Sequence, residues 1–127
     1  MFYEDYVRQK LAEYWKVPVS KILHLSIENP ISDYDLLFGK LKIDIKTSSP
    51  VRVIKKRKAI WDFSLRKLHQ GKKTGQNNEC DYFALLAIKN GIPKSIYLVP
   101  SYESPTNHIR ISLTGNSKYE KYKIFNI

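Results

Sequence analysis

The sequence predicts an α/β fold in which a mixed sheet of four to five strands is flanked by helices, and three observations indicate this class. An amphipathic helical pattern opens the chain. Short apolar segments, alternating or continuous and separated by Gly, Pro and Asn turns, follow it over most of the length. The 127 residues fit one domain, spanning residues 1–127, that is large enough to bury a hydrophobic core.

The first predicted element is a helix over Phe2–Trp15, which Pro18 is expected to end. On a helical wheel, one apolar stripe is formed by Val7, Leu11, Tyr14 and Trp15. Glu4 falls within that stripe. A carboxylate among apolar side chains costs free energy unless it has a partner, so Glu4 is a candidate site residue.

The next segments predict a β-hairpin with a turn at Gly39-Lys40. Residues 34–38 form a short apolar run before the turn, and residues 41–46 alternate after it. Because side chains alternate along a strand, Asp44 and Lys46 lie on one face, opposite Ile43 and Ile45.

Later apolar segments predict the remaining strands. The run at Tyr82–Ile88 is nearly continuous, which is typical of a central buried strand. Residues 71–78, rich in Gly and Asn, are expected to form a flexible loop, and Ser117–Tyr122 is compatible with a helical turn or an edge strand. Further strands are predicted at Val51–Ile54, Ala59–Leu65, Ser95–Val99 and His108–Leu113, and Ile22–Ile27 is either a strand or a helical turn.

The charge of the chain indicates a polyanionic partner. Lys and Arg total 22 against 12 Asp and Glu, a formal net charge of +10. Such a surplus favours nucleic acid, although a generally basic surface is the alternative. Basic residues that are expected to contact phosphates crowd the middle of the chain, namely Arg52, Lys55, Lys56, Arg57, Lys58, Arg66, Lys67, Lys72 and Lys73.

Other features limit the class of protein. Cys80 is the only cysteine, so an internal disulfide is excluded and a reducing compartment is favoured. No segment has the roughly 20 apolar residues of a membrane span, and the N-terminus lacks the pattern of a signal peptide. We therefore expect an intracellular protein, cytoplasmic or nucleoid-associated, with no membrane partner.

The hairpin carries the candidate chemistry. Asp35 stands at the start of one strand, and Asp44 and Lys46 near the end of the other, so all three are expected to converge. Two converging carboxylates repel each other unless a cation lies between them. Oxygen ligands with open positions suit Mg²⁺ or Mn²⁺, and Lys46 can stabilise charge on a phosphate. The alternative is an ordinary surface pair on an amphipathic strand.

The order of these residues resembles the PD-(D/E)xK nuclease superfamily. An acidic residue on the first helix is followed by Asp35 and then by Asp44-Ile45-Lys46-Thr47-Ser48. Further along, residues 80–84 and 96–100 are similar to the small homing-endonuclease branch. The resemblance extends from Glu4 to about Pro100 and implies a restriction-endonuclease-like fold. Tyr34 stands where the pattern has Pro, and Asp44 where Glu is more usual.

The resemblance also implies roles for residues of this chain. Asp35 and Asp44 would bind a catalytic Mg²⁺ or Mn²⁺, with the backbone carbonyl of Ile45 as a further ligand. Lys46 would position or activate the attacking water. Glu4 would be a further acidic residue near the metal.

Together, these observations predict a metal-dependent DNA endonuclease that hydrolyses phosphodiester bonds, site-specific in the manner of homing enzymes. A Holliday-junction resolvase or another structure-specific nuclease is the first alternative, and a non-catalytic nucleic-acid-binding module is the second. Because one centre cuts one strand, a homodimer or a higher symmetric oligomer is expected.

Overall fold

The computed structural model describes residues 2–24, 35–53, 58–69, 72–75, 80–105, 107–113 and 117–126. One α-helix and three short 3₁₀ turns accompany the strands. The helical elements are α1 (Phe2–Trp15), η1 (Val19–Lys21), η2 (Ser101–Glu103) and η3 (Glu120–Tyr122). The strands are β1 (Ile22–His24), β2 (Leu36–Phe38), β3 (Leu41–Ser48), β4 (Pro50–Val53), β5 (Lys58–Ser64), β6 (Arg66–His69), β7 (Lys72–Gly75), β8 (Tyr82–Lys89), β9 (Ile92–Pro100), β10 (His108–Ser112) and β11 (Lys123–Asn126).

Helix α1 confirms the first predicted element. Val7 and Leu11 of its apolar stripe are buried and Trp15 stacks on Phe38 of the sheet, whereas Tyr14 is half exposed. The helix ends before Pro18, in a Schellman motif: the Val17 N–H donates to the Ala12 carbonyl at 3.0 Å, and the Lys16 N–H donates to Glu13 at 3.2 Å. In the described ranges, no helix is long and apolar enough to cross a membrane.

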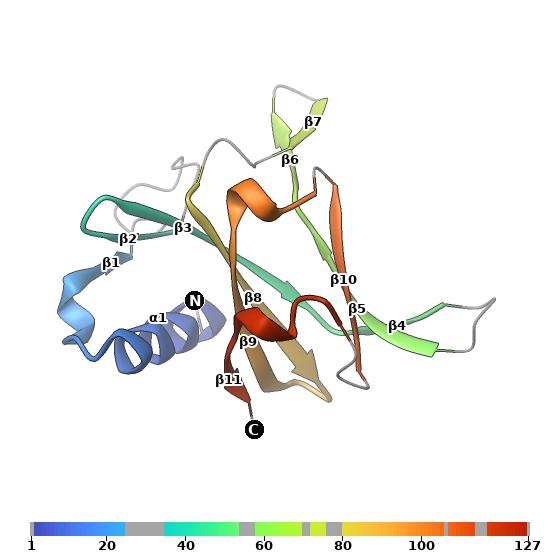
Figure 1. Cartoon of the computed structure of the whole chain (residues 1–127), viewed down its shortest axis with the longest axis horizontal. Helices are drawn as coiled ribbons and strands as arrows, with labels where there is room; N and C mark the ends of the chain where they lie inside the picture. Colours follow the sequence, from blue (N-terminus) through green and yellow to red (C-terminus); the bar gives the residue numbers. More distant parts are fainter. Residues whose placement is uncertain are drawn as a thin grey trace.

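The main sheet is mixed, as predicted, and has the strand order β1-β2-β3-β8-β9-β11 (Figure 1). Strands β3 and β8 are parallel and the other neighbours are antiparallel. The expected number of four to five strands was wrong, because β1 and β11 extend the sheet to six. Both are short and lie at its edges, where local alternation is weakest as a signal.

In the described residues, the second layer consists of strands and not of the additional helix that the sequence predicted. Strands β10, β5 and β4 form a three-stranded antiparallel sheet, and β6 and β7 form a two-stranded one. The parallel connection from β3 to β8 therefore runs through strands in its described part, rather than through the helix that is usual for such crossovers. The loop predicted at 71–78 was also wrong in part, since Lys72–Gly75 pairs with β6. Residues 76–78 lie outside the described part.

The main sheet buries a separate hydrophobic cluster on each face. The cluster on one face includes Val7 and Leu11 of α1 with Ile43 and Ile45 of β3. The cluster on the other face packs the second sheet against β8 and β9, and it includes Trp61, Phe63, Leu65, Phe83 and Tyr97. The molecule thus has three layers, with α1 on one side and the second sheet on the other.

Candidate active site

Asp44 and Lys46 project from β3 on the face of the main sheet that lies away from α1. Ile43 and Ile45 face the α1 cluster, and side chains alternate, so their neighbours point the other way. The Asp44 side chain is 8% exposed and that of Lys46 is 21% exposed. The Lys46 Nζ lies 3.2 Å from Asp44 Oδ2. The predicted Asp-x-Lys pair is therefore a largely buried ion pair rather than a surface pair.

Asp35 reaches the same place from the other strand of the hairpin. It directly precedes β2, and its N–H donates to the Ile43 carbonyl at 3.0 Å. Its Oδ2 accepts a hydrogen bond from the Ile45 N–H at 2.8 Å. The turn of this hairpin contains Gly39 at a φ of +61°, a conformation that glycine adopts without a steric cost. The structure thus brings together Asp35, Asp44 and Lys46.

The Asp44 carboxyl is the electrostatically strained member of this group. The pKa of Asp44 is raised from 3.8 to about 7, chiefly by burial and also by the nearby Asp35 carboxyl, against the lowering effect of Lys46. Asp44 Oδ2 is buried, and its 3.2 Å contact with the Lys46 ammonium is an ion pair that lies outside hydrogen-bonding geometry. Two neighbouring carboxyls with a single ammonium beside them are costly to bury, and a bound cation would offset their charge.

The backbone adds the carbonyl oxygen of Ile45 to the site formed by Asp35 and Asp44. A strand residue directs its N–H and its C=O to the same neighbour, and the Ile45 N–H points to Asp35. Strand β2 pairs with β3 only from Leu41 to Ile43, so the Ile45 carbonyl lies beyond that described pairing. The donor set of Asp35, Asp44 and Ile45 is made of oxygens, which suits Mg²⁺ or Mn²⁺. Among the described residues, no group of three or more His, Cys, Asp or Glu side chains is placed to hold a metal.

The site is supported by residues to which the sequence assigned no part in it. Asp81 clamps the start of β8 to β3: its Oδ2 accepts from the Lys42 N–H at 2.8 Å, and its own N–H donates to the Lys42 carbonyl at 2.7 Å. The neighbouring Cys80 is buried, and burial together with the Asp44 charge raises the pKa of its thiol to about 12. An Asp directly before a buried strand was the only sequence signal for this clamp.

Glu4 lies in a different environment. Its Oε1 is 2.7 Å from Nε2 of the buried His24, and Asp5 Oδ1 is 3.2 Å from Nδ1 of the same ring. His24 shares its strand face with Ile22, which belongs to the α1 cluster. These contacts place Glu4 on the α1 face of the sheet, whereas Asp44 and Lys46 face the other way.

The basic residues predicted to contact nucleic acid are placed only in part. Lys55, Lys56 and Arg57 lie outside the described residues. Arg52 belongs to β4, Lys58 to β5, Arg66 and Lys67 to β6, and Lys72 and Lys73 to β7. The β6–β7 hairpin projects from the rest of the fold (Figure 1). The hairpin follows directly after Leu65, which is buried in the second-sheet cluster together with Cys80.

No family model, no curated protein and no solved structure matches the chain. What the protein does therefore has to be argued from its own residues.

Proposed function

We propose that this protein is a metal-dependent DNA endonuclease of the PD-(D/E)xK type, with a restriction-endonuclease-like fold, that hydrolyses phosphodiester bonds. One observation carries the proposal. The buried Asp44 carboxyl lies beside that of Asp35, and the Lys46 ammonium is 3.2 Å from Asp44 Oδ2. This arrangement costs folding free energy, so a strand with a structural role alone gains nothing from it.

The residues of the hairpin divide the chemistry among them. Asp35, Asp44 and the Ile45 carbonyl would hold Mg²⁺ or Mn²⁺, and the Ile45 N–H fixes the orientation of the Asp35 carboxylate. When bound, the metal would polarise the scissile phosphate and acidify the attacking water. Lys46 is held close to Asp44 yet is partly exposed, so its ammonium can reach a phosphate and stabilise the negative charge that develops there.

The charge of the chain supports nucleic acid as the substrate. The net charge of +10 favours a polyanion, and β6 and β7 carry four of the basic residues that the sequence predicts to contact phosphates. Within DNA, we propose a site-specific duplex as the substrate.

The test is nicking of supercoiled plasmid with Mg²⁺ or Mn²⁺ and with EDTA, for the wild type and for the Asp44→Asn and Lys46→Ala variants. We expect metal-dependent nicking that falls at least about 100-fold in either variant, because each removes a group that acts in the transition state. The matched control is Lys89→Ala, which removes one exposed positive charge at the far end of β8 and should nick like the wild type.

Two other outcomes of this test would change the function that we assign. If plasmid is not cut but a four-way junction is, the enzyme is structure-specific. If neither is cut and DNA binds equally well to the wild type and to Asp44→Asn, the protein is a binding module and the endonuclease proposal is wrong.

A further inference from the structure

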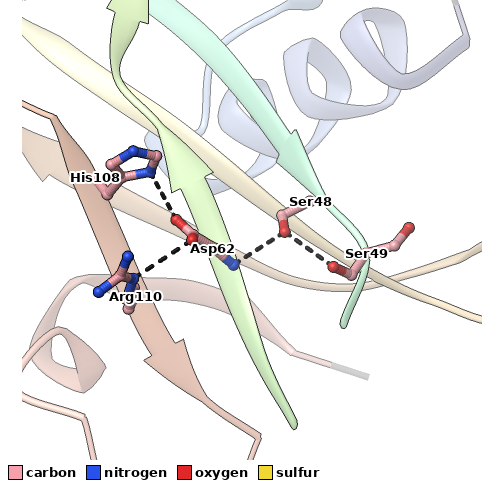
Figure 2. A network of polar contacts seen from close by, with 5 residues as sticks. All are labelled: Ser48, Ser49, Asp62, His108 and Arg110. Atoms are coloured by element: carbon pink, nitrogen blue, oxygen red, sulfur yellow. Dashed lines mark hydrogen bonds and ion pairs between the residues drawn. The ribbon is translucent and has the colours of Figure 1, made fainter. Parts of the chain in front are cut away.

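A polar network joins strand β3 to the outer face of the second sheet. Asp62 of β5 accepts from both neighbours on β10: its Oδ1 is 2.9 Å from His108 Nδ1, and its Oδ2 is 3.4 Å from Arg110 Nε (Figure 2). The Asp62 N–H donates to Ser48 Oγ at 3.1 Å. Ser48 lies two residues beyond Lys46 on the same face of β3.

The network leaves its positive groups available to a ligand. Arg110 uses Nε for Asp62, so the two terminal nitrogens of its guanidinium are not needed in that contact. The side chains of Arg110 and His108 are 66% and 42% exposed, whereas that of Asp62 is only 25% exposed. Asp62 therefore orients both side chains, and the Arg110 guanidinium presents a positive charge on the outer surface.

These side chains border a groove of about 720 Å³. Among the described residues, its lining contains no carboxylate and consists of Pro105, Asn107, His108, Arg110, Lys118 and Tyr119. The Lys118 ammonium lies 5.3 Å from the centre of the Tyr119 ring, and Tyr119 is itself buried. An open groove with Arg, Lys and Asn donors and without acids has the chemistry of a site for backbone phosphates.

The groove lies on the outer face of the second sheet, which packs on the side of the main sheet away from α1. Ile109 and Ile111 are buried against the main sheet, so His108 and Arg110 point outward from the second sheet. That outward direction is also the direction in which Asp44 and Lys46 leave the main sheet, away from α1. Figure 2 shows β5 and β10 with the network in front of β3 and with α1 behind.

From this arrangement we infer that the groove between β10 and the Lys118–Tyr119 turn is a second contact for DNA, which grips backbone phosphates through Arg110 and Lys118. Asp62 acts as a positioning residue that orients His108 and Arg110. The inference rests on the proposed function for the identity of the ligand as DNA. It assigns a role to the last part of the chain, which lies beyond the stretch that resembles nucleases.

The test measures binding of a short DNA duplex by fluorescence anisotropy over a series of salt concentrations. All proteins carry Asp44→Asn so that the DNA stays intact. Because each phosphate contact contributes about 0.9 to the slope of log Kd against log salt, Arg110→Ala with Lys118→Ala should lower the slope by about 1.8 and weaken binding. The control is Lys21→Ala, which removes an exposed positive charge from η1, next to α1; a change in its slope would show that the assay reads net charge alone.

Asp62→Asn separates positioning from charge. It removes a negative charge, which by itself would tighten binding of a polyanion, yet we expect weaker binding because His108 and Arg110 lose their common anchor. Equal slopes for the Arg110/Lys118 double variant and for Lys21→Ala would overturn the inference, and so would tighter binding by Asp62→Asn. Either result would concern the groove alone and would leave the plasmid-nicking test of the active site unaffected. Conversely, a failure to nick plasmid would not change the measured slopes of log Kd against log salt.

Discussion

The carboxyl of Asp44 holds its proton far above the pH at which a free aspartic acid loses it. Its pKa is raised from 3.8 to about 7, first by burial. Between these values the folded protein keeps a proton that the unfolded chain releases. The stabilisation from Asp44 is therefore fully present below pH 3.8 and is lost as the pH rises to about 7.

The raised pKa of Asp44 predicts that the free energy of unfolding depends on pH. In EDTA, the free energy of unfolding of the wild type should fall by up to about 4 kcal/mol across that window, and Asp44→Asn should abolish this fall. Above pH 7, the variant should be the more stable protein, and added Mg²⁺ should stabilise only the wild type. Urea denaturation at several pH values measures all three effects. Parallel pH profiles for the two proteins would contradict the buried, raised carboxyl.

At the scale of elements, helix α1 ends on a residue that is poorly suited to its place. Lys16 adopts a φ of 57°, the left-handed conformation that glycine tolerates best. Lys16→Gly should therefore increase the free energy of unfolding by about 1 kcal/mol, measured by urea denaturation. Lys16→Ala is the matched control, because alanine has the same steric conflict and should bring no such gain. Equal stability of both variants would show that the helix does not need this cap.

The hairpin of β2 and β3 is the element that assembles the site. Pairing of Leu36 with Ile43 brings Asp35 next to Asp44, and the Asp81 clamp holds β8 against the other edge of β3. The carboxylates are thus carried on strands that are paired on both sides of β3, which keeps their geometry rigid without support from a metal.

Among its described residues, the molecule contains one pair of converging carboxylates of the kind formed by Asp35 and Asp44. An active centre built on one such pair cuts one strand of DNA. We therefore predict a homodimer or a higher symmetric oligomer, which light scattering can measure directly. The expected consequence is that linear plasmid appears together with nicked circles. A monomer that accumulates only nicked circles would contradict this prediction.

The sequence by itself determined the features that depend on neighbours along the chain. The period of two in residues 41–46 placed Asp44 and Lys46 on one face, and the Gly39 turn brought Asp35 to them. The helix over Phe2–Trp15 and the buried strand near Tyr82–Ile88 followed from the same local patterns. These predictions held because helix and strand periodicity are properties of a few consecutive residues.

Only the tertiary structure decided what depends on distant parts of the chain. The parallel pairing of β3 with β8, the edge strands β1 and β11, and the second sheet in place of another helix all join segments far apart in sequence. Glu4 faces His24 rather than Asp44 for the same reason: a helical wheel shows which stripe a side chain occupies, but not which face of the sheet that stripe will cover. The raised pKa of Asp44 likewise needed a second cluster to bury it, because desolvation is a property of the packed molecule.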